Sequence, residues 1–222
     1  VEMPLPPKPV DIAENKESRQ DYRRRAAEVC NINAQAFQKS CRTRMTMNAV
    51  STFKKYKRFY VPWSADYRGR VYPIPAFLTP QDTDFGKSLL LFDQRSLVTP
   101  ECKHWLGFQC ATTYGLDKAT IEERLAWVDN NQDLITRVAE DPIGNLSEWE
   151  AADEPWQFLA SAEEYYATII TAARTHTRLP VATDATCSGL QILAGLARDA
   201  STAKLVNVLP SDKPQDAYKV VA

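Results

Sequence analysis

The sequence places one carboxylate, Asp184, between a short apolar segment and a run of small residues. Residues 179–191 have the sequence LPVATDATCSGLQ, and the β-branched apolar start predicts a buried strand that ends at Asp184. A carboxylate held at a strand end, with a backbone carbonyl beside it, can bind a hard cation such as magnesium, which also accepts phosphate oxygens. An aspartate in this position also commonly caps the next helix, and that alternative stays open here.

Two arginines flank a glycine in the segment 66–70, which has the sequence DYRGR. The aromatic and β-branched residues on both sides predict two extended segments around a tight turn. Guanidinium groups form paired hydrogen bonds with phosphate oxygens, so Arg68 and Arg70 suit an anionic ligand, with Asp66 holding one of them in place. The alternative is a hairpin turn that carries a surface ion pair.

Composition limits the classes of protein to consider. The chain has 222 residues and a formal charge of −1, and it contains no run of 18 apolar residues, which excludes a transmembrane helix. Its five cysteines form no CxxC pair and it has two histidines, so the sequence indicates neither a zinc site nor a disulfide framework. Residues 1–70 carry a net charge of +8 and residues 71–222 carry −9. A basic arm of this kind suits an anionic partner, although a solvated basic helix has the same composition.

Helical periodicity and capping residues predict the elements around these segments. Thr99 and Pro100 open a helix that Gly115 ends, and Thr120 with Glu123 forms a capping box. Helices are expected over 18–48, 100–114, 120–130, 155–174 and 188–204, with a short one from Ser147 and another from Ser211. Residues 1–10 and 206–210 are expected to be extended.

Large apolar side chains are expected to form the core. On the helix 155–174 they form a stripe of Trp156, Leu159, Ala160, Tyr166, Ile169 and Ile170. Aromatic residues assigned to packing are Trp105, Phe108, Trp127, Trp149, Trp156, Tyr165 and Tyr166. Cys187 is interpreted as a small buried side chain.

Taken together, these segments resemble the single-subunit RNA polymerases of bacteriophages and mitochondria. The resemblance is carried by FYVPWSADYRGRVYP (59–73), DEPWQFLA (153–160), LPVATDATCSGLQ (179–191) and ARDASTAKLVNVLPSDKPQDAY (197–218). It implies a mixed α/β, predominantly helical fold. A linker and basic helical segment at the end of the thumb would occupy 1–58, the first half of a right-hand palm 59–200, and the start of the fingers 201–222.

The resemblance also implies roles for individual residues. Asp184 would be the first of two aspartates that bind two magnesium ions, with the backbone carbonyl of Ala185 as a further ligand. The family usually has glycine in place of Ala185, so a positive φ there would strain the alanine. The other implied roles are triphosphate binding by Lys118, the nucleotide pocket for Tyr218, phosphate contacts for Arg68, Arg70, Lys87, Arg42 and Arg44, and turn formation by Asp66, Gly69 and Gly189.

The resemblance predicts a DNA-directed RNA polymerase, a nucleotidyltransferase whose partners are a DNA template, nascent RNA and NTPs, with no membrane. We expect a piece of a longer, monomeric phage enzyme that acts in the cytoplasm of an infected bacterium, or alternatively in a mitochondrion. In the family the second catalytic aspartate lies after position 222, so these 222 residues alone are expected to be inactive. The remaining alternatives are a family A DNA polymerase palm and a non-catalytic nucleic-acid-binding helical domain.

Overall fold

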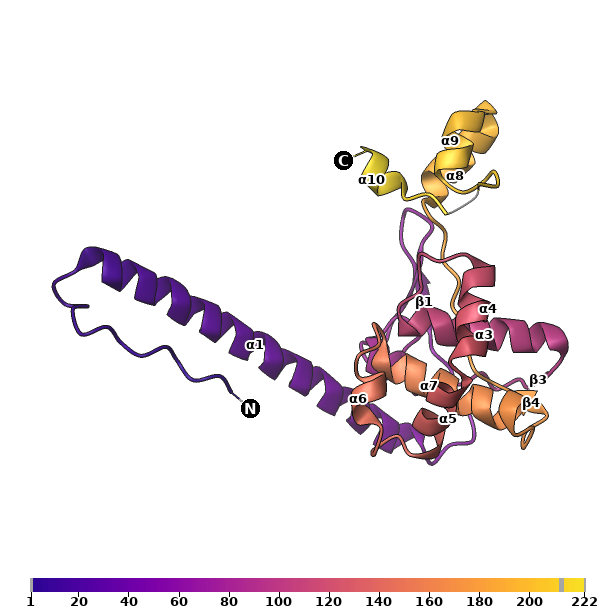
Figure 1. Cartoon of the computed structure of the whole chain (residues 1–222), viewed down its shortest axis with the longest axis horizontal. Helices are drawn as coiled ribbons and strands as arrows, with labels where there is room; N and C mark the ends of the chain where they lie inside the picture. The colour runs from indigo at the N-terminus through magenta and orange to yellow at the C-terminus, as the bar shows by residue number, and fades with distance from the viewer. Residues whose placement is uncertain (1, 212–213, 222) are drawn as a thin grey trace. The chain divides into compact units, whose positions relative to one another are not determined.

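The computed structural model describes residues 2–211 and 214–221, and it is mixed α and β with helix predominating (Figure 1). This confirms the fold class at the level of secondary structure. The chain divides into two compact units, Val1–Gly86 and Lys87–Ala222, which are described separately.

One long helix dominates the first unit. α1 (Lys16–Phe53) has 38 residues and begins at Asn15, whose side chain accepts hydrogen bonds from the N–H groups of Glu17 and Ser18. The helix predicted over 18–48 is therefore confirmed, and it extends further at both ends. Of the residues in this fully described helix, only Thr46 is buried, which fits its arginine-rich composition.

The residues before α1 run back alongside it (Figure 1). The Met3 N–H donates to Asn33 Oδ1 over 2.8 Å, and Asn33 Nδ2 donates to the Met3 carbonyl over 2.9 Å. One amide side chain on the helix thereby satisfies both backbone groups of Met3. Residues 2–9 lie in no helix or strand, which agrees with the predicted extended linker, whereas Val10 begins a turn.

A hairpin carries the two arginines. β1 (Trp63–Ala65) pairs antiparallel with β2 (Val71–Pro73), with Trp63 opposite Pro73. The Asp66 N–H donates to the Arg70 carbonyl over 2.8 Å, which closes the loop between the strands. The two extended segments and the tight turn predicted around DYRGR are confirmed.

The second unit is largely helical and also contains one small sheet. β3 (Ser96–Leu97) and β4 (His176–Thr177) pair antiparallel, with Ser96 opposite Thr177. The remaining elements are α2 (Asp84–Ser88), which crosses the boundary between the units, α3 (Pro100–Tyr114), α4 (Ile121–Asn130), α5 (Gln132–Glu140), α6 (Leu146–Trp149), α7 (Pro155–Tyr165), the π-helix η1 (Tyr166–Ile170), α8 (Ser188–Ala197), α9 (Ala200–Leu205) and α10 (Ala217–Val221).

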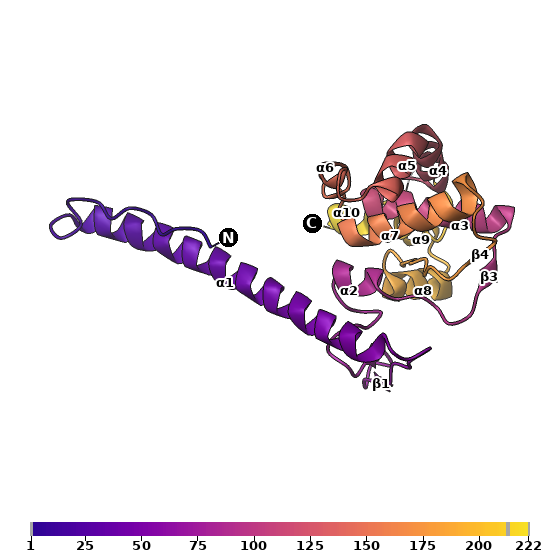
Figure 2. The same ribbon diagram turned by 90° about the horizontal axis from the view of Figure 1, so that it is seen from below.

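The main core lies among α3, α4, α5 and α7, which Figure 2 shows side by side. Its fully buried members include Leu106, Cys110, Val128, Ile135, Val138, Phe158 and Tyr165. The Phe158 ring lies edge-on to Tyr114 at 5.0 Å between centroids. A second, smaller cluster joins α8, α9 and α10 through Ala194, Ala203, Val206 and Ala217.

The helix ends predicted from capping residues are confirmed. Thr99 accepts a hydrogen bond from the Cys102 N–H, with Pro100 in the first turn. Thr120 and Glu123 form the capping box at the start of α4. Gly115, at the end of α3, has a φ of 137°, a conformation that side chains other than glycine's seldom adopt.

The long helix predicted over 155–174 is shorter, and only part of its predicted apolar stripe meets the core. α7 ends at Tyr165 and continues as the π-helix η1. Trp156, assigned to the apolar stripe, is 44% exposed, whereas Phe158 is fully buried. The stripe is confirmed in part, since Leu159, Ile169 and Ile170 pack against the core, but the buried face of α7 also includes polar side chains, among them Ser161 and Glu164.

The assignment of the aromatic side chains to packing is supported by ring contacts of Trp105 with Phe108, Trp127 with Tyr114 and Trp156 with Trp149, although not all of them are buried. Phe108, Trp149 and Tyr165 are buried, but Trp105 is 36% exposed and the Tyr166 hydroxyl donates to Glu140 over 2.6 Å. These amphipathic rings lie at the edge of the core because their polar or bulky parts reach solvent.

The buried strand predicted over 179–184 is wrong. Within the described residues this segment belongs to no sheet, and residues 182–184 are exposed. A strand requires a neighbouring strand for its backbone hydrogen bonds, and β3 pairs with the residues just before this segment instead.

Several boundaries in the last third of the chain also differ. The helix predicted over 188–204 breaks at Arg198, which has a φ of 52°, and Asp199 then caps α9. Residues 206–209 form a turn, α10 begins at Ala217, and α6 begins at Leu146. Cys187 is half-buried. No described helix has both the length and the apolar character needed to cross a membrane.

Replacing Phe158 with alanine tests the position of the core. We expect Phe158→Ala to lower the free energy of unfolding by about 3–5 kcal/mol, because it leaves a cavity beneath the Tyr114 ring. Ile143→Ala, at a residue that is 90% exposed, is the control and should change it by less than about 0.5 kcal/mol. Urea denaturation of each variant measures the difference, and similar values for both would contradict this core.

Candidate functional site

Asp184 is exposed and caps no helix in the described structure. Its Oδ1 accepts a hydrogen bond from the Ala185 N–H over 2.8 Å, while Oδ2 accepts none from a described residue. The N-cap of α8 is Cys187, three residues later, and it makes no side-chain capping bond. The interpretation of Asp184 as a helix cap is therefore not supported, and one carboxylate oxygen is left for a ligand.

The segment around Asp184 is held by neighbours of the aspartate. Gln109 on α3 is buried, and its Oε1 accepts a hydrogen bond from the Ala182 N–H over 3.1 Å. Two residues after Asp184, the Thr186 hydroxyl accepts a hydrogen bond from Asn207 over 2.8 Å. Side-chain hydrogen bonds on both sides of Asp184 therefore fix its backbone without using its carboxylate.

The two small residues near Asp184 differ from expectation. Ala185 is absent from the described non-glycine residues with positive φ, so alanine here carries no strain of that kind. Gly189 lies in the first turn of α8, its φ is not positive, and a Cβ atom there would have no neighbour within 4 Å. Gly189 was expected to form a turn, but it lies within α8, where nothing in its described conformation requires glycine.

Asn207 joins two segments that sequence reasoning treated separately. It has a φ of 58°, a conformation that asparagine tolerates better than most residues. Besides its bond to Thr186, its Nδ2 donates to the Gln215 carbonyl over 2.9 Å and its Oδ1 accepts from the Gln215 N–H over 2.7 Å. Asn207 thereby links the segment after Asp184 to the segment that leads into Tyr218.

Lys118 lies on the loop between α3 and α4, and its Nζ is 2.6 Å from Asp117 Oδ2. The hydrogen bond and charge of Asp117 raise the pKa of Lys118, and the charge of Asp216 adds to this effect. Asp216 precedes Tyr218 by two residues, and the Tyr218 side chain is 69% exposed. Within the described residues no hydrogen bond or ion pair joins Lys118 to Tyr218, and the direct partner of Lys118 is Asp117.

Asp66 organises the arginine turn. Its Oδ1 accepts hydrogen bonds from the N–H groups of Arg68 and Arg70, over 2.9 and 3.0 Å, and its Oδ2 pairs with the Arg68 guanidinium. Although burial opposes it, hydrogen bonding from Arg70 and Arg68 lowers the pKa of Asp66. Gly69 has a φ of 77°, so the turn requires its conformation. These contacts confirm that Asp66 holds Arg68.

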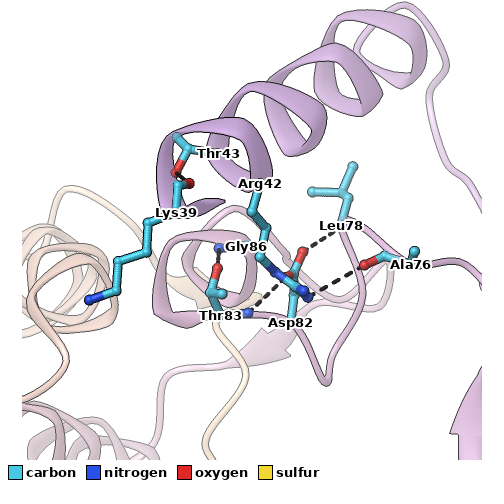
Figure 3. Close-up of polar contacts among 8 residues, drawn as sticks. All are labelled: Lys39, Arg42, Thr43, Ala76, Leu78, Asp82, Thr83 and Gly86. Carbon is cyan, nitrogen blue, oxygen red and sulfur yellow. Dashed lines mark hydrogen bonds and ion pairs between the residues drawn. The ribbon is translucent and has the colours of Figure 1, made fainter. Parts of the chain in front are cut away.

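Arg42 is bound to a buried aspartate (Figure 3). Its Nη2 and Nε lie 2.7 and 3.1 Å from Asp82 Oδ1, and the Asp82 side chain is fully buried. Asp82 also accepts hydrogen bonds from the N–H groups of Leu78 and Thr83. The Arg42 guanidinium therefore ties α1 to the loop before α2, and its predicted contact with nucleic acid would have to coexist with this ion pair.

The two remaining cationic residues are less engaged. Arg44 on α1 is exposed and Lys87 on α2 is partly exposed, and neither forms an ion pair with a described residue. Within residues 2–211 and 214–221, no group of three or more His, Cys, Asp and Glu side chains could hold a metal ion. Asp184 and the Ala185 carbonyl together offer two of the oxygen ligands that magnesium accepts, so they fit part of a magnesium site.

Comparison with known proteins decides the family. A model of DNA-dependent RNA polymerase matches residues 97–222, more than half of the chain. The chain belongs to this family. Membership favours an RNA polymerase over the two alternatives, a family A DNA polymerase and a non-catalytic nucleic-acid-binding domain.

Individual polymerases are similar along nearly the whole chain. The DNA-directed RNA polymerase of Enterobacteria phage K11 is 34% identical over 218 residues, which are 98% of this chain and 24% of that enzyme. T7 RNA polymerase of Escherichia phage T7 is 32% identical over 218 residues, again 98% of this chain and 24% of the relative. The mitochondrial enzyme of Neurospora crassa is 37% identical over 166 residues, 74% of this chain and 12% of the relative. The chain thus spans about a quarter of the phage polymerases that it matches.

The sequence analysis missed four residues that anchor the predicted site residues through hydrogen bonds: Gln109, Asn207, Asp82 and Arg124. Each acts through hydrogen bonds to residues distant in sequence, which spacing does not reveal. The one available signal was Asn207 within a turn, since asparagine favours positive φ.

Replacing Asp82 tests the role of its buried carboxylate. We expect Asp82→Asn to lower the free energy of unfolding by about 1–3 kcal/mol, because one amide oxygen cannot replace two carboxylate oxygens that bind Arg42 and Leu78. Asp21→Asn, on the exposed face of α1, is the control and should cost less than about 0.5 kcal/mol.

The stabilisation that Asp82 contributes is expected to depend on pH. Burial alone would raise the pKa of Asp82, but hydrogen bonds, first among them the one from Arg42, outweigh burial and lower the pKa in the folded protein. Its stabilisation is therefore complete above roughly pH 4, the unfolded value, and is lost as pH falls through the lower folded pKa. Urea denaturation across this range should show the difference from Asp82→Asn shrinking in acid. A difference that does not change with pH would contradict the assignment.

Proposed function

We propose that a complete polymerase containing this chain synthesises RNA on a DNA template and that Asp184 is one of its metal-binding carboxylates. The observation that supports this is the exposed Asp184 carboxylate, which caps no helix although its backbone is held on both sides. A ligand carboxylate needs a fixed position and unsatisfied oxygens, and Asp184 has both.

Magnesium would be held by Asp184 and the Ala185 carbonyl, together with carboxylate ligands from elsewhere in the polymerase. When bound, two such ions lower the pKa of the attacking 3′-hydroxyl and neutralise charge on the pyrophosphate that leaves. Asp184 contributes the negative charge that holds the ions, and the Ala185 carbonyl contributes a neutral oxygen whose position needs no strained backbone.

Lys118 and Tyr218 are proposed to bind the incoming nucleotide. Lys118 presents a single ammonium group, which suits a triphosphate as a point charge. Its present partner is the exposed carboxylate of Asp117, which phosphate oxygens can replace. Tyr218, largely exposed at the start of α10, offers an aromatic face to the nucleotide pocket.

Arg68 and Arg70 are proposed to bind phosphates of the template and of the RNA–DNA hybrid, with further contacts from Arg44, Lys87 and Arg42. The Arg68 side chain is 56% exposed and is oriented by Asp66. An exposed guanidinium with a fixed orientation can form two parallel hydrogen bonds with a phosphate. The basic character of α1 and of the hairpin, within the segment of net charge +8, gives an electrostatic attraction independent of base sequence.

The family relationship supports a proposal for the domains. Residues 1–58 would form the end of the thumb, 59–200 the first half of the palm and 201–222 the start of the fingers. The partners would be a DNA template, nascent RNA and NTPs, and the enzyme would act as a monomer in the cytoplasm of an infected bacterium or in a mitochondrion.

Replacing Asp184 tests the metal site. In the complete polymerase we expect Asp184→Asn to reduce kcat by at least about 1,000-fold, because an amide is a poor ligand for magnesium, while template binding stays within about twofold. Asp133→Asn, at an exposed residue in the first turn of α5, is the control and should keep normal activity. A near-normal rate for Asp184→Asn would show that the site is elsewhere.

Replacing the turn arginines tests the phosphate contacts. We expect Arg68→Ala and Arg70→Ala each to weaken template binding and to reduce the slope of log affinity against log salt by about 1, because each removes one phosphate contact. Arg137→Ala, at an arginine paired with Glu148 in the second unit, is the control and should leave the slope unchanged. Fluorescence anisotropy with labelled template at several salt concentrations measures it. An unchanged slope for both turn variants would mean that these arginines serve the hairpin alone.

A further inference from the structure

Arg124 is a buried cation beside the Lys118 loop. It lies on α4 and is only 9% exposed. Its Nη1 donates to the Thr112 hydroxyl over 3.0 Å, and its Nη2 donates to the Asp117 carbonyl over 2.6 Å. Its guanidinium carbon lies 4.5 Å from the centre of the Phe108 ring, and its Nε has no partner within the described chain.

Burying the charged Arg124 side chain in this way is unfavourable, and an apolar side chain would avoid that cost. The two hydrogen-bond acceptors of Arg124 are a hydroxyl and a backbone carbonyl, both uncharged, while the Asp117 carboxylate pairs with Lys118. Burying a charge without a direct carboxylate partner is unfavourable, and the Phe108 ring returns only part of that loss. A structural account based on stability alone therefore gives little reason for arginine at this position.

The contacts of Arg124 act on the backbone that carries Lys118. The loop starts at Gly115, and the Leu116 N–H donates to the Ala111 carbonyl over 3.0 Å. It ends at Thr120, where the capping box begins α4. Between these fixed ends, the bond from Arg124 to the Asp117 carbonyl holds the peptide group that joins Asp117 to Lys118.

We propose that Arg124 is a positioning residue that holds the Lys118 loop so that the lysine meets the nucleotide triphosphate. This inference rests on the proposed function, in which Lys118 binds that triphosphate. The planar fork of arginine spans the Thr112 hydroxyl and the Asp117 carbonyl at once, which the single ammonium group of lysine cannot do. Thr112 in turn donates to the Phe108 carbonyl over 2.7 Å, so the loop is anchored to α3 through Arg124.

The test is steady-state RNA synthesis by the complete polymerase at saturating template. We expect Arg124→Lys, which keeps the charge and loses the fork, to raise the KM for NTP about tenfold with kcat within about twofold. Lys118→Ala should raise KM by a similar factor. Arg124→Lys added to Lys118→Ala should change KM little further, because a residue that acts through Lys118 has no effect once Lys118 is absent.

Two further variants make the result interpretable. Thr112→Val keeps Arg124 but removes one of its two anchors, and it should raise KM about two- to threefold, again only when Lys118 is present. It therefore tests the proposal even if Arg124→Lys does not fold. Arg137→Lys, which alters an arginine on α5 paired with Glu148, is the matched control and should leave KM unchanged.

The possible failures are distinguishable. If Lys118→Ala leaves the KM for NTP unchanged, both the proposed role of Lys118 and the positioning role of Arg124 are wrong. If Lys118→Ala raises KM but Arg124→Lys raises it by the same factor with or without Lys118, Lys118 keeps its role and the positioning role of Arg124 is wrong. A fall in kcat without a change in KM for Arg124→Lys would also overturn the proposal.

Discussion

A carboxylate that binds a metal must be fixed in space while its own oxygens stay available, and the segment around Asp184 meets both demands. The buried Gln109 accepts a hydrogen bond from the Ala182 N–H, and Asn207 donates one to Thr186. The residues that these anchors bind, Ala182 and Thr186, each lie two positions from Asp184, so neutral groups hold the chain on both sides of it. Since these anchors take no oxygen from the carboxylate, its remaining capacity can go to a cation.

Side chains that bond to backbone recur wherever a predicted site residue lies outside regular structure. Asp66 binds the N–H groups of the arginine turn, Arg124 binds the carbonyl before Lys118, and Asn207 binds both backbone groups of Gln215. A loop cannot be held by a helix or sheet ladder, so its position depends on such bonds. These residues are consequently as important to the site as those expected to touch substrate.

Elements that depend on residues close in sequence were predicted correctly, and those that depend on residues distant in sequence were not. Thr99 and Thr120 were placed correctly as caps because a cap depends on residues within one helical turn. The strand expected at 179–184 was wrong because strand formation depends on a distant partner. The stripe on α7 was right only in part, because the helix also buries Glu164, which pairs with Arg174. In the candidate site, the types of residue were recognisable from sequence, whereas the anchors Gln109, Arg124 and Asn207 required coordinates.

The basic residues of the candidate site pair with aspartates, and these ion pairs differ in how exposed they are. Arg68 and Lys118 pair with the carboxylates of Asp66 and Asp117, which are close in sequence; the Lys118 pair is exposed on both sides, whereas the Asp66 side chain is only 22% exposed. The exposed Lys118–Asp117 pair contributes little free energy, so another anion can replace this carboxylate at small cost, whereas Asp66 stays bound to the hairpin and orients Arg68. Arg42 differs, because the side chain of its partner Asp82 is fully buried and would be left unpaired. Arg42 therefore holds α1 to the loop before α2, whereas the Lys118 ammonium group is held only by an exposed neighbour.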